Sequence, residues 1–250
     1  RTGTKFFADY FGKFKNTVAL HEPKPSRILR MWSMAYLDGK VSNDYMEAVL
    51  WQKREKLISD IKTGTYIESN PYLLGFAPVL DKVFNQPLVI QIVRDPREYI
   101  RSSLNHGNAF GIKLLFNKYV PFWLPNVGKI LGLKKSLSTK MKAAGYWKIA
   151  NAELISSGSK LKHYRRIRFE DLFDETQSEL SKIVKIIGIE QKLVKGDQKH
   201  TAVNKSRFSS VPGWQKWDSI ECNEIDKICN PLMNTLGYGN EKEWQEKLNH

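Results

Sequence analysis

The pattern of apolar and polar positions predicts strands that alternate with helices. Leu88-Val-Ile-Gln-Ile-Val93 is a nearly unbroken β-branched run, which is typical of a buried strand in a parallel sheet. Shorter runs that end in polar residues predict strands at 65–69 and 164–169. Helical spacing predicts helices at 5–14, 27–37, 43–62, 174–187 and 219–236, and another that contains 146–151.

Local signals mark the ends of two of these helices. Asn43-Asp44 predicts a cap for the helix at 43–62, and Gly188 predicts the C-terminal end of the helix at 174–187. Strands that alternate with such helices imply a mainly parallel sheet with helices on both faces. Since no long linker divides the 250 residues, we predict a single α/β domain over residues 1–250.

The first residues have the composition of an anion-binding turn. Arg1-Thr-Gly-Thr-Lys5 places a cation, a glycine and two hydroxyls directly before a predicted helix. Gly3 lets the backbone approach a ligand closely, and the N–H groups of the helix start carry roughly half a positive charge. The nucleotide P-loop pattern G-x-x-x-x-G-K-[ST] is not met, because the segment has one glycine and Lys5 follows Thr4. The segment therefore predicts a phosphate or sulfate site that differs from an ordinary ATP or GTP site.

A second candidate anion site follows the strand at 88–93. Arg94 comes directly after this strand, and Asp95-Pro96 then begins a helix with proline near its first position. In open α/β sheets, ligands bind outside the carboxyl ends of the strands. Ser102 lies eight residues after Arg94, and a guanidinium with a hydroxyl suits a second phosphate.

With two later segments, the chain resembles the sulfotransferases that use 3′-phosphoadenosine 5′-phosphosulfate (PAPS). Ile167–Leu172 (I-R-F-E-D-L) is similar to the family's [YF]-E-[DQ]-[LM] signature, and Ser210–Trp217 is similar to its late S-V-G-R-W-x-[KR] segment. Leu236-Gly-Tyr238 resembles the end of many relatives. The motifs stand in the family's order and span nearly the whole chain. The resemblance implies a P-loop-like sulfotransferase fold.

The resemblance also implies how PAPS, and its product adenosine 3′,5′-bisphosphate, would be bound. The first turn would hold the 5′-phosphosulfate, Arg94 and Ser102 the 3′-phosphate, and Phe169 would lie near the adenine. The expected cofactor-binding residues are Arg1, Thr2, Gly3, Thr4, Lys5, Phe6, Arg94, Ser102, Phe169, Ser210, Trp214 and Lys216. Lys5 departs from a hydroxyl that is common in the family, and Pro212-Gly213 replaces its Gly-Arg. Lys216 and Arg101 are candidate substitutes for that missing cation, and each is otherwise a solvated surface charge.

Sulfuryl transfer needs cations at the departing phosphate and a general base at the acceptor. Arg1 occupies the family's catalytic cation position. Glu22 lies 21 residues after Arg1, the distance at which the protein-tyrosine branch has its catalytic glutamate, so we predict Glu22 as the base. His21 is a second candidate base, a group that orients the acceptor, or a loop histidine packed beside prolines. No metal is predicted, because no His/Asp/Glu cluster shows ligand spacing.

Two segments are candidates for acceptor binding. In the glycan branches of the family, a strand end comparable to 65–72 faces the acceptor, which implies this role for Glu68 and Asn70. Glu68 is otherwise a surface acid that caps a helix. The aromatic segment 110–133 is broken by prolines and predicts an acceptor-side lid. Its Phe122 and Trp123 would line an acceptor pocket, touch a membrane that carries a glycolipid, or cover the core.

Composition agrees with this interpretation. Forty Lys and Arg against 26 Asp and Glu give a net charge of +14, which favours anionic ligands or an anionic membrane. Nucleic acid is not an expected partner, because zinc-finger, RNP and basic-heptad patterns are missing from the sequence.

Cys222 and Cys229 share one face of a predicted helix and are expected to pack as small apolar groups. We expect a cytoplasmic protein, with a peripheral membrane contact as a second option.

The sequence thus predicts an enzyme that moves a sulfuryl group from PAPS to a hydroxyl of a carbohydrate or glycolipid. A small-molecule or nucleoside kinase and a non-catalytic module that binds anionic glycans stay open as alternatives. A kinase would be expected to carry a lysine-serine pair in the first turn and a strand-end aspartate for magnesium. The family's first strand would precede Arg1, so we expect either residues upstream or a sheet that lacks this strand.

Overall fold

The computed structural model describes residues 4–61, 64–105, 132, 137–173, 178–189 and 211–249. The chain divides into two compact units. Unit 1 contains Val93–Ile155 and Ser206–His250, and unit 2 contains Thr2–Ile92 and Ser156–Lys205. Strands and helices occur together, which confirms the α/β class. The expectation of one domain over residues 1–250 stays a prediction.

Unit 2 is organised around a pair of parallel strands, β1 (Thr17–His21) and β2 (Thr65–Ser69). The register pairs Thr17 with Thr65 and His21 with Ser69, so both strands end at the same edge. The prediction of β2 is confirmed. The sequence analysis predicted no strand before Glu22 and, in one interpretation, a loop at His21, whereas residues 17–21 in fact pair with β2. The short sequence Thr-Val-Ala-Leu-His lacks a clear alternation, and its partner lies 48 residues away.

Helix α1 (Thr4–Phe11) packs against both strands of this pair. It ends three residues before the predicted Phe14, which lies beyond a turn and still joins the same core. A second sheet consists of β3 (Leu88–Val93) and β4 (His163–Arg168), followed by η4 (Glu170–Phe173) and α9 (Ser178–Ile187). The buried side chains of this core are Phe6, Phe7, Phe11, Phe14, Ile167, Leu172, Leu180, Ile183, Val184 and Ile189.

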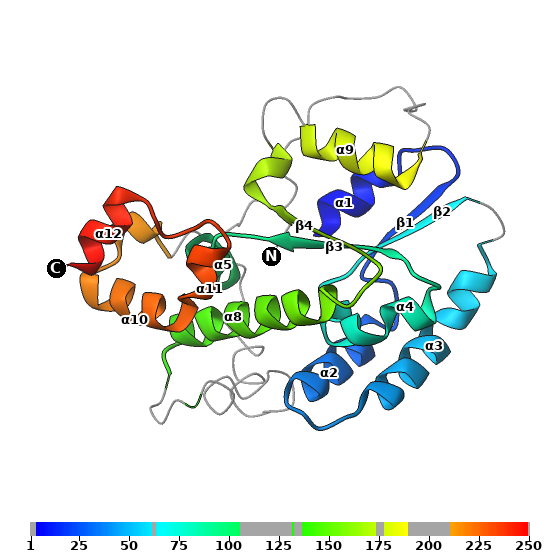
Figure 1. Cartoon of the computed structure of the whole chain (residues 1–250), viewed down its shortest axis with the longest axis horizontal. Helices are drawn as coiled ribbons and strands as arrows, with labels where there is room; N and C mark the ends of the chain where they lie inside the picture. The colour runs from blue at the N-terminus through cyan, green and yellow to red at the C-terminus, as the bar shows by residue number, and fades with distance from the viewer. Residues whose placement is uncertain are drawn as a thin grey trace. The chain divides into compact units, whose positions relative to one another are not determined.

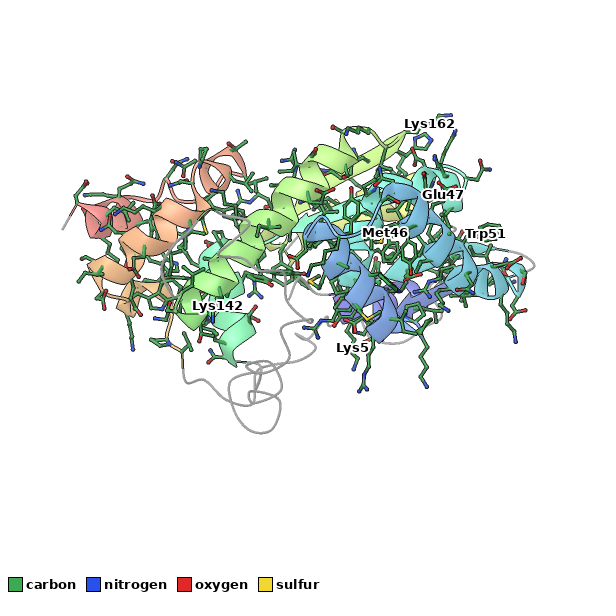
Figure 2. All side chains as sticks on the ribbon, turned by 90° about the horizontal axis from the view of Figure 1, so that it is seen from below. Lys5, Met46, Glu47, Trp51, Lys142 and Lys162 are labelled. Atoms are coloured by element: carbon green, nitrogen blue, oxygen red, sulfur yellow. The ribbon has the colours of Figure 1, made fainter. Side chains whose placement is uncertain are left out.

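The other core of unit 2 lies among helices. These are α2 (Ser26–Leu37), α3 (Asn43–Ser59), η1 (Pro71–Val79) and α4 (Leu80–Val83). Met46 of α3 is fully buried here, whereas Trp51 on the same helix is 49% exposed (Figure 2). The predicted cap of α3 was off by one residue, because the Ser42 hydroxyl accepts the Tyr45 N–H at 3.3 Å.

The described strands form two two-stranded sheets, where the sequence predicted one mainly parallel sheet (Figure 1). The pairing of β1 with β2 is parallel, as expected. Strand β3 matches the predicted 88–93, and β4 ends one residue earlier than predicted. A continuous β-branched run identifies a strand well but does not identify its partner, which explains this difference.

Unit 1 is mainly helical. Its elements are α5 (Pro96–Ser103), α8 (Thr139–Gly158) as far as Ile155, η5 (Trp214–Lys216), α10 (Ser219–Cys229), α11 (Leu232–Thr235) and α12 (Lys242–Leu248). The predicted helix at 219–236 is in fact two helices. Pro231 separates them, because it has no N–H to donate and its ring clashes with the preceding turn. Cys222 and Cys229 are free and buried in this core, as predicted.

The lid predicted at 110–133, including Phe122 and Trp123, lies outside the described residues except for Gly132. None of the helices in the described ranges is long and apolar enough to cross a membrane.

Candidate functional site

The carboxyl ends of β1 and β2 bring two predicted site segments together in unit 2. Glu22 follows β1 directly and Asn70 follows β2. The Glu22 N–H donates to the carbonyl of Ser69 at 3.2 Å, which extends the strand pairing by one residue. Ligands of parallel sheets bind outside this kind of edge.

Glu22 has an unusual backbone conformation. Its φ of +45° lies in the left-handed region, which costs a residue with a Cβ atom on the order of 1–3 kcal/mol. The side chain is partly exposed, with His21 Nε2 at 3.8 Å from Glu22 Oε1. His21 Nδ1 lies 3.3 Å from the Ser69 carbonyl oxygen. The structure thus places the two candidate bases side by side at the strand edge.

Two residues that the sequence analysis did not select also belong to this edge. The Arg30 guanidinium lies 5.7 Å from the centre of the Tyr72 ring. Burial raises the pKa of Tyr72, the negative charge of Glu22 raises it further, and Arg30 opposes both. Tyr72 was the last residue of a segment with predicted acceptor contacts, whereas nothing in the pattern of α2 singled out Arg30.

Glu68 is not the surface acid that one interpretation predicted. Its side chain is 5% exposed, and the fully buried Arg54 binds both carboxylate oxygens, Nε to Oε2 at 2.8 Å and Nη2 to Oε1 at 2.7 Å. Asn70, not Glu68, caps the following helix η1, because its Oδ1 accepts the Tyr72 N–H at 2.9 Å. An acceptor contact by Glu68 or Asn70 stays a prediction, and these internal bonds weigh against it.

The start of α1 lies at the same edge. The five residues 12–16 join α1 to β1, and the two elements pack together and run in opposite directions (Figure 1). The helix is about 12 Å long and the strand about 17 Å, so Thr4 and His21 lie toward one end of the pair. Lys5 is exposed, in keeping with an anion-facing cation. The first-turn residues Arg1, Thr2 and Gly3 lie outside the described residues.

The predicted contributions of Phe6 and Phe169 involve an aromatic cluster. Phe6 is 7% exposed and its ring centre lies 4.9 Å from that of Phe173, which lies 5.0 Å from Phe169. The Phe6 side chain is therefore part of the core. A contact of Phe6 with the nucleotide stays a prediction. Phe169 is only partly buried.

The other predicted nucleotide residues are in unit 1. Arg94 follows β3, its carbonyl accepts the Trp147 indole N–H at 2.8 Å, and its Nη2 lies 3.8 Å from Glu98 Oε2. Ser102 lies in α5, which begins at Asp95-Pro96 as predicted and whose first turn is capped by the Asp95 carboxylate. Lys216 is exposed, and Ser210 lies outside the described residues.

Trp214 has a different environment from the predicted nucleotide contact. It is 7% exposed, and the Arg97 guanidinium lies 4.5 Å from its ring centre. The Trp214 ring also contacts the ring of Trp244. The side chain is thus part of the core of unit 1. A direct contact of Trp214 with a nucleotide stays a prediction.

Comparisons with known proteins give one structural neighbour. No protein-family model and no curated protein matches the chain. A solved structure titled "Sulfotransferase Domain from the Curacin Biosynthetic Pathway" superposes with a TM-score of 0.47 at 16% identity, over 99% of this chain and 93% of that one. A likeness at this level carries no conclusion about activity.

The strand edge in unit 2 can support proton transfer beside an anion. A carboxylate and an imidazole lie next to each other, and the N–H groups of a helix start lie toward the same end. Among the described residues no cluster of three His, Cys, Asp or Glu side chains could hold a metal ion.

Proposed function

We propose that this chain is a sulfotransferase that moves a sulfuryl group from PAPS to a hydroxyl of a carbohydrate or glycolipid. The observation that carries the proposal is Glu22, a carboxylate held at positive φ at the carboxyl end of β1 beside His21. Backbone strain of this kind is concentrated at functional sites. The helix start of α1, toward the same end, would supply the N–H donors for the departing phosphate.

In the proposed reaction, Glu22 accepts the proton of the acceptor hydroxyl as its oxygen attacks sulfur. The new S–O bond forms as the bond between sulfur and the bridging phosphate oxygen breaks, and that oxygen keeps the electron pair. Arg1 and the N–H groups at the start of α1 stabilise the charge on the departing phosphate. His21 is the alternative proton acceptor, since it lies 3.8 Å from Glu22.

Nucleotide binding divides between two groups of residues. We assign the 5′-phosphosulfate to residues 1–6, the 3′-phosphate to Arg94 and Ser102, and the adenine environment to Phe169. These residues take no direct part in proton transfer. The variant Arg94→Ala is therefore expected to weaken nucleotide binding while the reactivity of bound nucleotide changes less.

A thermal-shift series tests the nucleotide class. Adenosine 3′,5′-bisphosphate is expected to raise the melting temperature. At a concentration 100 times its dissociation constant, it would add about 2.7 kcal/mol to the free energy of unfolding. A shift with ATP alone would contradict the proposal in favour of a kinase. The absence of a shift with adenosine 3′,5′-bisphosphate, ATP and GTP would favour the glycan-binding module.

Transfer of radiolabelled sulfate from PAPS to a panel of sugars and glycolipids tests the reaction. Glu22→Gln keeps the size of the side chain and removes the base, so we expect kcat to fall by about 10²- to 10⁴-fold with binding of adenosine 3′,5′-bisphosphate unchanged. His21→Gln is the matched variant for the second base. Full activity in Glu22→Gln together with loss in His21→Gln would assign the base to His21.

The proposed cellular setting follows from the charge. A net charge of +14 would attract an anionic membrane surface, so we propose a cytoplasmic protein that meets a lipid-borne acceptor at the membrane. Flotation with anionic liposomes tests this, with Trp123→Ala as the variant in the predicted lid.

A further inference from the structure

Arg54 of α3 is a charged side chain with no exposed surface. Its Nε and Nη2 form a fork with the two oxygens of Glu68, at 2.8 and 2.7 Å. The remaining hydrogen bonds go to backbone carbonyls: Nη1 donates to Lys24 at 3.3 Å and to Lys53 at 3.2 Å, and Nη2 donates to Pro23 at 3.4 Å. One guanidinium therefore joins α3, the end of β2 and the loop after β1.

Two of these carbonyls belong to the residues that come directly after Glu22. Pro23 and Lys24 are bound from the inside of the unit by Arg54, and Glu22 itself is bound from β2 through the carbonyl of Ser69. The loop is thereby fixed on both sides of the left-handed residue. A conformation that costs on the order of 1–3 kcal/mol persists only when its surroundings impose it, and these bonds are among the described contacts that do so.

The Glu68 carboxylate is fixed in turn. The Tyr66 hydroxyl donates to Oε2 at 2.7 Å, and the Asn70 side-chain amide donates to Oε1 at 2.7 Å. Burial and the neighbouring Glu68 charge raise the pKa of Tyr66, which keeps its hydroxyl protonated as a donor. The network is complete, with each carboxylate oxygen bound by Arg54 and by one neutral donor.

Stability alone gives a weak account of this pair. Burying two charges costs several kcal/mol in lost hydration, and well-packed apolar residues of similar volume are often equally stable. A planar fork provides what apolar residues lack, because it can bind a carboxylate and three carbonyls in one fixed geometry. Lysine offers a single charged nitrogen and could not span these partners.

We propose that Arg54 is a positioning residue that holds the loop after β1 so that the Glu22 carboxylate stays at the strand edge. The inference rests on the proposed function of Glu22 as the base. Arg54 touches no reacting atom in this scheme and acts through the carbonyls of Pro23 and Lys24.

Hydrogen exchange measured by NMR on the full chain tests the positioning without any substrate. In Arg54→Met, which keeps a long apolar stem, the Glu22 amide is expected to exchange at least about tenfold faster, since a loop held by charge-assisted bonds is released. The Thr65 amide donates to the Asn16 carbonyl at 2.8 Å at the other end of the same strand pair. Its exchange rate therefore reports any general loosening of unit 2. Exchange at Glu22 that matches wild type, or that rises only in step with Thr65, would overturn the proposal.

Arg97→Met is the matched control, because Arg97 is also buried in a carboxylate pair but has both partners in unit 1. It is expected to leave the exchange rate of the Glu22 amide unchanged relative to that of the Thr65 amide. If Arg54→Met does not fold, Arg54→Lys, which keeps the charge and loses the fork, is measured in the same way with the same expected direction.

Kinetics then separate this proposal from the proposed function. With PAPS and an active acceptor, Arg54→Lys is expected to lower kcat by about 10- to 100-fold, the effect of a displaced catalytic group, with the KM for PAPS within about twofold of wild type. An unchanged kcat, or an effect on KM alone, would overturn the positioning role. A wild-type chain without transferase activity would overturn the proposed function, while the exchange result would still show whether Arg54 holds the loop.

Discussion

Arg97 binds Glu241 through two parallel hydrogen bonds, Nη1 to Oε2 at 2.9 Å and Nη2 to Oε1 at 2.6 Å, although the residues are 144 positions apart. The same guanidinium binds Asp95, with Nη2 at 2.6 Å from Oδ2. It also lies 4.5 Å from the ring centre of Trp214 and 4.9 Å from that of Trp244. The start of α12 is thereby fixed to the turn that follows β3.

The Arg97 pair is expected to dominate the local stability of unit 1. Arg97→Met removes the cation and leaves the Asp95 carboxylate buried without it, so we expect the free energy of unfolding to fall by about 3–5 kcal/mol. Arg101→Met is the control, because Arg101 is 39% exposed and pairs with Glu98 within one helix, which predicts a loss below about 0.5 kcal/mol. Urea unfolding measures both. Equal losses in the two variants would contradict the assigned role.

The same pair predicts a dependence of stability on pH. Burial acts to raise the pKa of Glu241, but the hydrogen bonds from Arg97 and the charge of Arg97 lower it overall. A carboxyl with a lowered pKa stabilises the fold above its unfolded pKa of about 4.3, and this contribution is lost as pH falls through the folded value. Wild type is therefore expected to be more stable than Glu241→Gln at pH 7, with the difference shrinking below about pH 4. A constant difference from pH 7 to pH 3 would refute this.

The sequence predicted the elements that local signals define. The β-branched run gave β3, and Asp95-Pro96 gave the capped start of α5. Strand β1 was missed because its five residues have no strong pattern and form a strand only by pairing with β2. Sheet partners depend on contacts between distant residues, which one sequence does not display.

The site was predicted in part for a similar reason. His21 and Glu22 are adjacent in the chain, so their proximity did not depend on contacts between distant residues. Arg54 and Arg97 have the sequence appearance of solvated helix charges, and their burial depends on carboxylates 14 and 144 residues away. Long-range partners of this kind explain why a surface acid was one of the two interpretations of Glu68.

The two cysteines are expected to be unreactive in the folded chain. Cys222 and Cys229 are buried and free, and burial raises the pKa of both thiols. Since the thiolate is the reactive form, a disulfide reagent at pH 8 should modify neither thiol in the native protein. Both thiols should react in about 6 M guanidinium chloride, which unfolds even very stable domains. Rapid modification of either thiol without denaturant would contradict the packing of unit 1.

Gly75 lies where η1 packs against Ser33 of α2. A Cβ atom there would lie 2.6 Å from Ser33 Cα and 2.7 Å from its carbonyl oxygen, and the Gly75 N–H donates to Ser33 Oγ at 2.9 Å. Because backbone atoms cannot rotate away, Gly75→Ala is expected to lower the free energy of unfolding by about 1–3 kcal/mol. Among the described residues, a Cβ atom at Gly213 would meet only the movable Gln215 side chain, so Gly213→Ala should change stability by less than about 0.5 kcal/mol. Thermal unfolding compares the two, and a neutral Gly75→Ala would contradict the close packing.

Glu22 allows function and stability to be separated at one position. Glycine at a φ of +45° avoids the penalty of about 1–2 kcal/mol that a Cβ atom brings there. Glycine also gives the unfolded chain more freedom, which lowers the free energy of unfolding by about 0.4–1 kcal/mol. Glu22→Gly should therefore be as stable as wild type or more stable by up to about 1.6 kcal/mol, while the proposed sulfuryl transfer is lost. Glu22→Gln keeps the strained backbone and should lose activity without gaining stability. Truncating a residue that serves only packing would destabilise the protein. A fall of more than about 1 kcal/mol in the free energy of unfolding of Glu22→Gly would therefore identify Glu22 as structural and remove the base from the proposed reaction.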